Sequence, residues 1–163
     1  MNGLSIEIDT QQLVQALLKN PALLGRNVSN AILRVTKSVA RSAREYAPKA
    51  FSTLTQSIHD TQVSQYEGVV SAGVDYATAV ERGTSRQPMP PVANILDWIR
   101  VRRIEPNQPD MDQEDLAFIV ARSIAARGTP PQPYMGPALA DNRRDAERRL
   151  NIAIDAALAG RAA

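Results

Sequence analysis

Residues 21–47, PALLGRNVSNAILRVTKSVARSAREYA, carry the apolar pattern that decides the fold. Apolar side chains recur there at steps of three and four residues, which places them along one side of a long helix. The members of this stripe are Val28, Ile32, Val35, Val39, Ala43 and Tyr46. We expect the helix to run from Pro21 and to end before Pro48, because the residue preceding a proline is disfavoured in the helical region.

The segment before this helix predicts a short strand and a short helix. Leu4, Ile6 and Ile8 alternate with polar residues, a pattern typical of a half-buried strand. Thr10 is expected to cap a helix that ends at the Asn20-Pro21 step.

A hairpin is expected after the long helix. Residues 62–66 and 69–74 favour two strands, and Glu67-Gly68 between them favours a tight turn. Residues 75–82 then predict one or two helical turns ending at Gly83, and residues 84–91 predict an exposed, proline-containing loop.

Three further helices are expected in the second half of the chain. The first carries an apolar stripe with Trp98 and stops near Glu105-Pro106. The second is expected to begin with a capping box of Asp112 and Asp115 and to stop at Gly128. An extended spacer, residues 129–133, separates it from the last helix, for which Pro137 suits the first turn.

This element order predicts an α+β fold: an N-terminal strand, a long helix packed on a small antiparallel sheet, and C-terminal helices. With 163 residues, we expect residues 1–163 to form a single domain. Residues 128–134 are interpreted as an extended proline-rich arm. No internal repeat is expected.

Composition limits the possible chemistry. The net charge is only +2 and there is no cysteine, so disulfides and thiolate metal sites are excluded. His59, the one histidine, stands beside Asp60 in a polar segment, which favours a solvated side chain over a catalytic base. Neither a phosphate-binding glycine motif nor a run long enough to span a membrane is present. We therefore expect no catalytic, cofactor-binding or metal-binding residues and no enzymatic activity.

Two charged clusters have alternative interpretations. Asp110, Asp112, Glu114 and Asp115 lack the spacing of a calcium loop and are interpreted as acids at a helix start. The arginines of the last helix, Arg143, Arg144, Arg148 and Arg149, are interrupted by acidic residues. A salt-bridged helix face is favoured there, and a small DNA-binding protein that uses this Arg-rich helix remains the alternative.

Three blocks of sequence together resemble the tail-completion and head–tail joining family of long-tailed phages (minor tail protein Z-like). They are AREYAPKAFSTLTQSI at residues 43–58, VDYATAVERGT at residues 74–84 and RGTPPQPYMGPAL at residues 127–139. The second resembles the family motif Tyr-Ala-x-x-Val-Glu-x-Gly-Thr, and the third its proline-rich approach to an aromatic residue. The family's usual Thr-Gly in the first block is replaced here by Ser52-Thr53. Residues 92–107, which include Trp98, resemble a helical insertion found in only some members of the family.

The resemblance implies a structural virion protein of the phage neck or tail that is assembled in the bacterial host cytoplasm. Its expected partners are other copies of itself in a ring, of which a hexamer is one size, together with the phage portal or connector and tail-tube proteins. Genomic DNA would pass through such a ring, and no membrane is involved. The subunit-interface residues that the motifs imply are Tyr76, Glu81, Gly83, Thr84, Pro130, Pro131, Pro133, Tyr134 and Pro137. Within the proline-rich arm, Tyr134 is the expected anchor.

Overall fold

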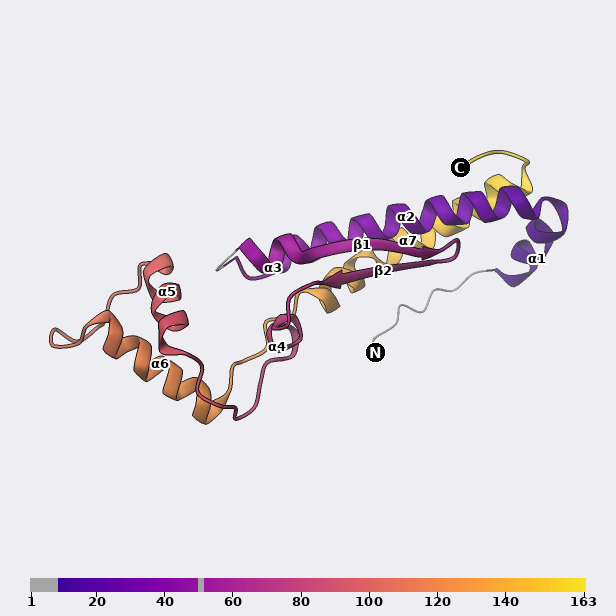
Figure 1. Ribbon diagram of the computed structural model, residues 1–163. Coiled ribbons are helices and arrows are strands. Elements are labelled where there is room, and N and C mark those ends of the chain that lie inside the picture. Colours follow the sequence, from indigo (N-terminus) through magenta and orange to yellow (C-terminus); the bar gives the residue numbers. More distant parts are fainter. Residues whose placement is uncertain (1–8, 50–51) are drawn as a thin grey trace. The chain divides into compact units, whose positions relative to one another are not determined.

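The computed structural model describes residues 9–49 and 52–163 (Figure 1). The strand expected over Leu4, Ile6 and Ile8 lies outside these residues. The chain combines helices with a two-stranded antiparallel sheet, which confirms the predicted α+β class. In order, the elements are α1 Thr10–Lys19, α2 Pro21–Tyr46, α3 Ser52–Ser57, β1 Ile58–Ser64, β2 Glu67–Ala72, α4 Ala77–Arg82, α5 Val92–Arg102, α6 Gln113–Arg127 and α7 Met135–Leu158.

The described residues group into two compact units. The long-helix unit comprises the residues up to Ala47, Thr53–Val74 and Tyr134–Ala163, and so contains α1, α2, all of α3 except Ser52, the hairpin and α7. The insert unit comprises Asp75–Pro133 with Pro48, Lys49 and Ser52, and so contains α4, α5 and α6. That the whole chain is a single domain stays a prediction, which one cooperative unfolding transition would support.

Side chains at the helix junction explain how α1 gives way to α2. Asp9 caps α1, since its Oδ1 accepts hydrogen bonds from the backbone N–H groups of Gln11 and Gln12 at 2.9 and 3.3 Å. The predicted cap, Thr10, is instead the first helical residue. Asn20 ends α1 and also caps α2, where its Oδ1 accepts from the Leu23 N–H at 3.3 Å and Pro21 occupies the first helical position.

Helix α2 has the predicted limits. It ends at Tyr46, and Ala47 takes an extended conformation before Pro48. Val39 and Ala43 of the predicted stripe are buried, but Tyr46 is 45% exposed and was wrongly placed on the buried side. Its Oη donates to Asp141 Oδ2 at 2.6 Å, and this hydrogen bond raises the pKa of Tyr46. The phenol therefore gains its partner at the surface.

Small side chains allow α2 and α7 to pack closely along their length, as Figure 1 shows. The helices are antiparallel, because Asn27 near the start of α2 bonds to Ala153 late in α7, whereas Ser38 further along α2 bonds to Asn142 early in α7. The buried alanines of the two helices are Ala31, Ala40, Ala43, Ala138, Ala146, Ala153 and Ala157. Larger side chains at these positions would force the helices apart.

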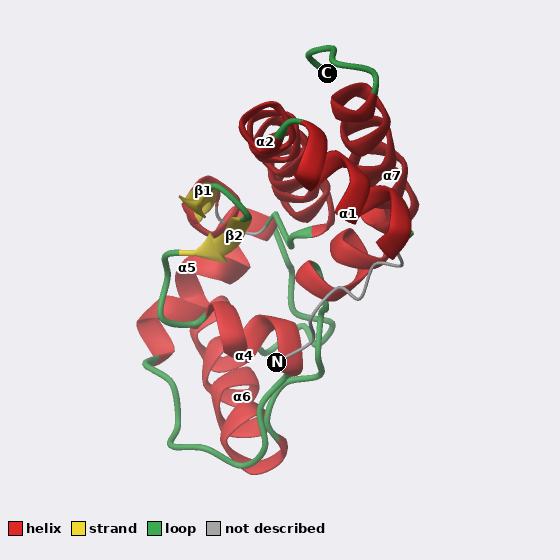
Figure 2. Cartoon of the chain, turned by 90° about the vertical axis from the view of Figure 1, so that its right-hand side faces the viewer, coloured by secondary structure: helices red, strands yellow, loops and turns green. Residues whose placement is uncertain are grey.

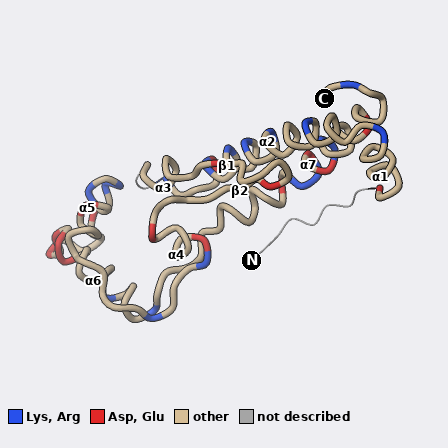
Figure 3. The backbone as a smooth tube through the Cα atoms, turned by 45° about the vertical axis from the view of Figure 1, so that its right-hand side comes forward, with Lys and Arg blue, Asp and Glu red and all other residues tan. Residues whose placement is uncertain are grey.

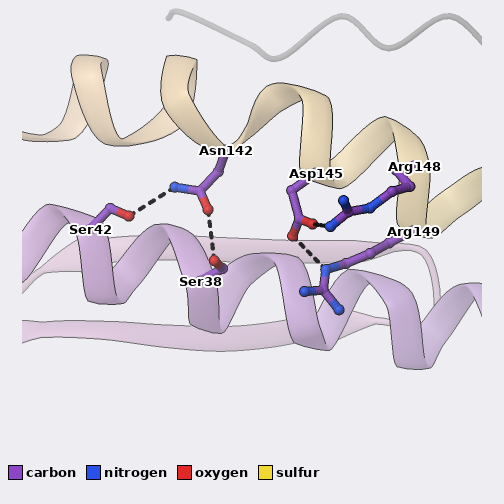
Figure 4. Close-up of polar contacts among 6 residues, drawn as sticks. All are labelled: Ser38, Ser42, Asn142, Asp145, Arg148 and Arg149. Carbon is purple, nitrogen blue, oxygen red and sulfur yellow. Dashed lines mark hydrogen bonds and ion pairs between the residues drawn. The ribbon is translucent and has the colours of Figure 1, made fainter.

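A buried amide fixes the register between the two helices (Figure 4). Asn142, 8% exposed, accepts a hydrogen bond from Ser38 Oγ at 2.7 Å. Its Nδ2 donates to Ser42 Oγ at 3.0 Å and to the Ala138 carbonyl at 2.8 Å. A sliding movement of α7 along α2 would leave these polar atoms buried without partners, which is costly.

Replacing Asn142 by alanine is expected to lower the free energy of unfolding by about 1–3 kcal/mol, because Ser38 and Ser42 lose their partner inside the helix pair. Urea denaturation followed by far-UV circular dichroism measures this. Ser42→Ala, which removes one hydrogen bond of the same network, should cost less. Equal stabilities of wild type and Asn142→Ala would show that the network does not stabilise the register.

The hairpin packs one face on α2, but its turn is not where we predicted. Thr61 pairs with Val69 and Gln62 with Gly68, so the turn is at Gln65 and Tyr66, and Glu67-Gly68 belongs to β2. The reason for a glycine at position 68 is tertiary: a Cβ there would collide with the Thr36 side chain of α2. The predicted strands, residues 62–66 and 69–74, were therefore displaced toward the C-terminus.

Within the insert unit, α5 and α6 pack on each other. Ile99 of α5 and Ala117 and Ala121 of α6 are buried between them. Helix α5 ends at Arg102 because Arg103 adopts a left-handed conformation, a little before the predicted stop at Glu105-Pro106. Asp112 and Asp115 form the predicted capping box at the start of α6.

Candidate functional site: a clasp between two Arg-Gly-Thr segments

Two segments far apart in sequence meet in the insert unit. One, Arg82-Gly83-Thr84, begins with the last residue of α4, and the other, Arg127-Gly128-Thr129, begins with the last residue of α6. Thr84 and Thr129 form an isolated antiparallel bridge. Figures 1 and 2 show the two loop segments running side by side. We call residues 80–87 and 125–132 together the clasp.

Backbone and hydroxyl groups hold the centre of the clasp. The Thr84 N–H donates to the Thr129 carbonyl at 3.0 Å, and the Thr129 N–H donates to Thr84 Oγ1 at 3.0 Å. The two threonine hydroxyls are also 3.0 Å apart and hydrogen-bonded. All three bonds lie between partly buried residues 45 positions apart. The clasp therefore closes the base of the segment that contains α5 and α6.

The outer bonds of the clasp are reciprocal. The Gln132 N–H donates to the Val80 carbonyl at 2.8 Å, and the Gln87 N–H donates to the Ala125 carbonyl at 3.4 Å. In each segment the glutamine donor, Gln87 or Gln132, stands three residues after the central threonine. In each segment the carbonyl acceptor, that of Val80 or Ala125, stands four residues before the same threonine. The clasp thus has an approximate twofold symmetry in its hydrogen bonds.

This symmetry reflects a short repeat in the sequence. The segments RGTSRQP, residues 82–88, and RGTPPQP, residues 127–133, share Arg-Gly-Thr and Gln-Pro at the same spacing. The expectation that the chain has no internal repeat was therefore wrong at this scale. The repeat could have been found from the sequence by comparing the residues around the two predicted glycine helix stops, Gly83 and Gly128.

Both clasp glycines are required by conformation and by space. Gly83 and Gly128 end α4 and α6 with φ angles of 70° and 77°, in the region that side chains rarely adopt. A Cβ on Gly83 would be 2.6 Å from the Thr129 carbonyl oxygen, and one on Gly128 would overlap the Thr84 carbonyl oxygen. Each glycine therefore lets the opposite segment approach.

The structure brings together most of the residues that the motifs implied for a subunit interface. Glu81, Gly83 and Thr84 lie in one half of the clasp, and Pro130 and Pro131 in the other. Tyr76, next to the start of α4, is 45% exposed. Pro133 is exposed and Pro137 is partly buried in the first turn of α7.

Tyr134 does not have the exposure expected of an anchor. It is 2% exposed, which makes it the largest of the fully buried side chains of the described residues. A side chain this buried presents almost no surface to another subunit, so the structure favours a packing role. In the proline-rich arm, the side chains accessible to a partner are those of Pro130, Pro131, Gln132 and Pro133.

The histidine has a serine neighbour that the sequence did not suggest. His59 and Ser71 face each other across the hairpin, with Nε2 3.0 Å from Ser71 Oγ and Nδ1 2.9 Å from the Ser57 carbonyl. A base and a hydroxyl in this arrangement resemble part of a catalytic triad. His59 is exposed, however, and the carbonyl takes the place of the buried carboxylate, so we interpret the pair as a cross-strand polar contact.

Acidic neighbours on α7 pair with three of the four arginines of the cluster. Arg143 pairs with Glu147 at 3.1 Å, and Asp145 pairs with both Arg148 and Arg149. The hydrogen bond from Arg149 is the main cause that holds the pKa of Asp145 below its ordinary value. Figure 4 shows the two arginines converging on the carboxylate, and Figure 3 shows acidic and basic residues interleaved on this helix. This arrangement is that of a salt-bridged helix face.

Other features of the described residues offer little chemistry. Residues 9–49 and 52–163 contain no cluster of three or more histidine, cysteine or acidic side chains that could hold a metal ion. A hollow of about 80 Å³ beside Asn27 is lined by Ala31, Arg34, Arg149, Ile152, Ala153 and Ala163. Asn27 itself is satisfied, since it bonds to Ala153, Arg161 and Ala163. None of the described helices has the length and apolar character of a membrane span.

The chain matches no family model, no curated protein and no solved structure. The clasp and the motifs that form it are therefore the features from which a function can be inferred.

Proposed function

We propose that this chain is a structural subunit of the neck or tail of a long-tailed phage and acts in head–tail joining or tail completion as an oligomeric ring. The observation that carries the proposal is the clasp. Two of the sequence blocks that resemble the phage family, residues 74–84 and 127–139, are separated in the sequence by the 42 residues 85–126. In the clasp they are in contact, because Thr84 and Thr129 are hydrogen-bonded.

The clasp supports this function because it holds short exposed segments on a rigid base. Pro130, Pro131 and Pro133 are exposed while Thr129 and Gln132 are fixed by backbone hydrogen bonds. Proline side chains on an already ordered backbone lose little conformational entropy when a partner binds. Rings form when head-to-tail contacts between identical subunits close.

The proposal excludes a catalytic role, and His59→Ala is the corresponding control. The His59–Ser71 pair lies on the hairpin, outside the clasp. If the chain is a structural subunit, His59→Ala should assemble as the wild type does. A hydrolytic activity that disappears in this variant would contradict the proposal.

Replacing Tyr76 by alanine is expected to weaken ring formation or binding to the neighbouring virion proteins by about tenfold or more, because an exposed aromatic side chain next to the clasp is lost. Size-exclusion chromatography with light scattering measures the oligomer. Co-purification with portal and tail-tube proteins of the same phage measures partner binding.

Tyr66→Ala is the matched control, since Tyr66 is 61% exposed but lies in the hairpin turn. This variant should behave as the wild type. A wild-type chain that stayed monomeric and bound neither portal nor tail-tube protein would overturn the proposed function. A salt-dependent shift of duplex DNA would instead favour the DNA-binding alternative.

A further inference from the structure

Helix α6 exposes two large apolar side chains, Phe118 and Ile119, on its outer face. Ala117 and Ala121, both 0% exposed, define the side of α6 that packs on α5. Phe118 and Ile119, on the other side, are 51% and 49% exposed. Large side chains exposed next to each other on a helix are a common feature of interaction surfaces.

Charged residues flank this apolar pair symmetrically. Asp115 and Arg122 are exposed and lie on the same outer face, three or four residues before and after Phe118 and Ile119. The stripe therefore reads acid, apolar pair, base, and its midpoint falls between Phe118 and Ile119.

Neither Asp115 nor Arg122 has an ion-pair partner among the described residues. Asp115 Oδ2 only accepts a long hydrogen bond, 3.4 Å, from the Asp112 N–H. Two helical turns, or roughly 10 Å, separate Asp115 from Arg122, so they do not pair with each other. Figure 3 shows the acidic start of α6.

We infer that the outer face of α6, formed by Asp115, Phe118, Ile119 and Arg122, docks on the same face of a second copy of this chain. When two such helices meet antiparallel about a twofold axis at the apolar pair, Asp115 of each copy lies opposite Arg122 of the other. Phe118 of each copy then lies opposite Ile119 of the other.

The charge pattern selects this occupant. A stripe with an acid at one end and a base at the other is complementary to itself only in the antiparallel arrangement, and a parallel arrangement would place like charges together. A single pair of helices buries less surface than a standard protein interface. We therefore expect a dimer of micromolar affinity that weakens as salt screens the exposed charges.

Charge reversal tests the contact. Asp115→Arg and Arg122→Asp each place like charges opposite each other in the homodimer, and each should raise the dissociation constant about tenfold or more. An equimolar mixture of the two variants restores both opposite-charge pairs and should associate about as strongly as the wild type. Sedimentation velocity over a concentration series measures the association of each single variant and of their mixture. Circular dichroism verifies that each variant is folded.

Phe118→Ser should also weaken association, because it removes half of the apolar centre. Arg102→Asp is the matched control: it has the same charge change as Arg122→Asp and is exposed, but it lies on α5. It should associate as the wild type does. A wild type that stays monomeric, single variants that associate normally, or a mixture that stays apart would each overturn the inference.

This contact does not depend on the proposed function. A ring is closed by head-to-tail contacts, whereas the α6 contact is twofold. A ring formed through other surfaces would persist in Asp115→Arg and Arg122→Asp, and only its pairing with a second ring would be lost. Failure of self-association through α6 and failure of binding to virion proteins are therefore distinguishable outcomes.

Discussion

Gly128→Ala is expected to lower the free energy of unfolding of the insert unit by about 2–5 kcal/mol, because it combines backbone strain with a steric clash. The φ angle of 77° disfavours any side chain, and the new Cβ would overlap the Thr84 carbonyl oxygen. The clasp must open to accommodate it. Urea denaturation and hydrogen exchange of the Thr84 and Gln132 amides measure the effect.

Gly160→Ala provides the matched control. Gly160 also follows a helix and has a φ of 68°, but a Cβ there would meet nothing within 4 Å. Gly160→Ala should therefore lower the free energy of unfolding through backbone strain alone, by about 1–2 kcal/mol at most. If Gly128→Ala cost no more than Gly160→Ala, close approach of the two clasp segments would not be the reason for a glycine at position 128.

Tyr134→Ala is expected to destabilise the isolated chain by about 3–5 kcal/mol, the range for removing a large buried aromatic side chain. Tyr134 is 2% exposed and precedes the first turn of α7. An anchor that acted only between subunits would behave differently, since its loss would leave the monomer as stable as before. Thermal unfolding at low protein concentration distinguishes these two roles.

Tyr134→Phe is the control for this variant, because it keeps the ring and removes only the hydroxyl. It should retain most of the stability. A Tyr134→Ala chain with wild-type stability but weakened oligomerisation would restore the anchor role that the burial of Tyr134 argues against.

Local signals were sufficient for several of the helix boundaries. Asn20-Pro21, Ala47-Pro48, Asp112 with Asp115, and Gly128 each act through groups within a few residues of themselves, and the structure confirms these limits. The predicted cap of α1 was wrong by one position, because Asp9, the neighbour of Thr10, can also accept hydrogen bonds from the first helical N–H groups and does so. Capping depends on which side chain first reaches the free N–H groups.

Glycine was the residue for which local interpretation failed most clearly. Gly68 suggested a turn, yet it lies in β2 because Thr36 of α2 occupies the space of a side chain. The hairpin itself was predicted, and its turn was not. Exposure was equally difficult to predict: Tyr46 has periodic spacing with the buried stripe but lies at the surface, and Tyr134 is buried in a segment rich in proline.

The sequence by itself determined the α+β class, the long helix from Pro21 to Tyr46 and the glycine stops at Gly83 and Gly128. These follow from periodicity and from backbone chemistry, which act over a few residues. Only the tertiary structure decided that the two Arg-Gly-Thr segments pair with each other and that α6 exposes Phe118 and Ile119. The physical reason is that hydrogen bonds between residues 45 positions apart, and the burial of one helix face rather than another, depend on which segments meet in space.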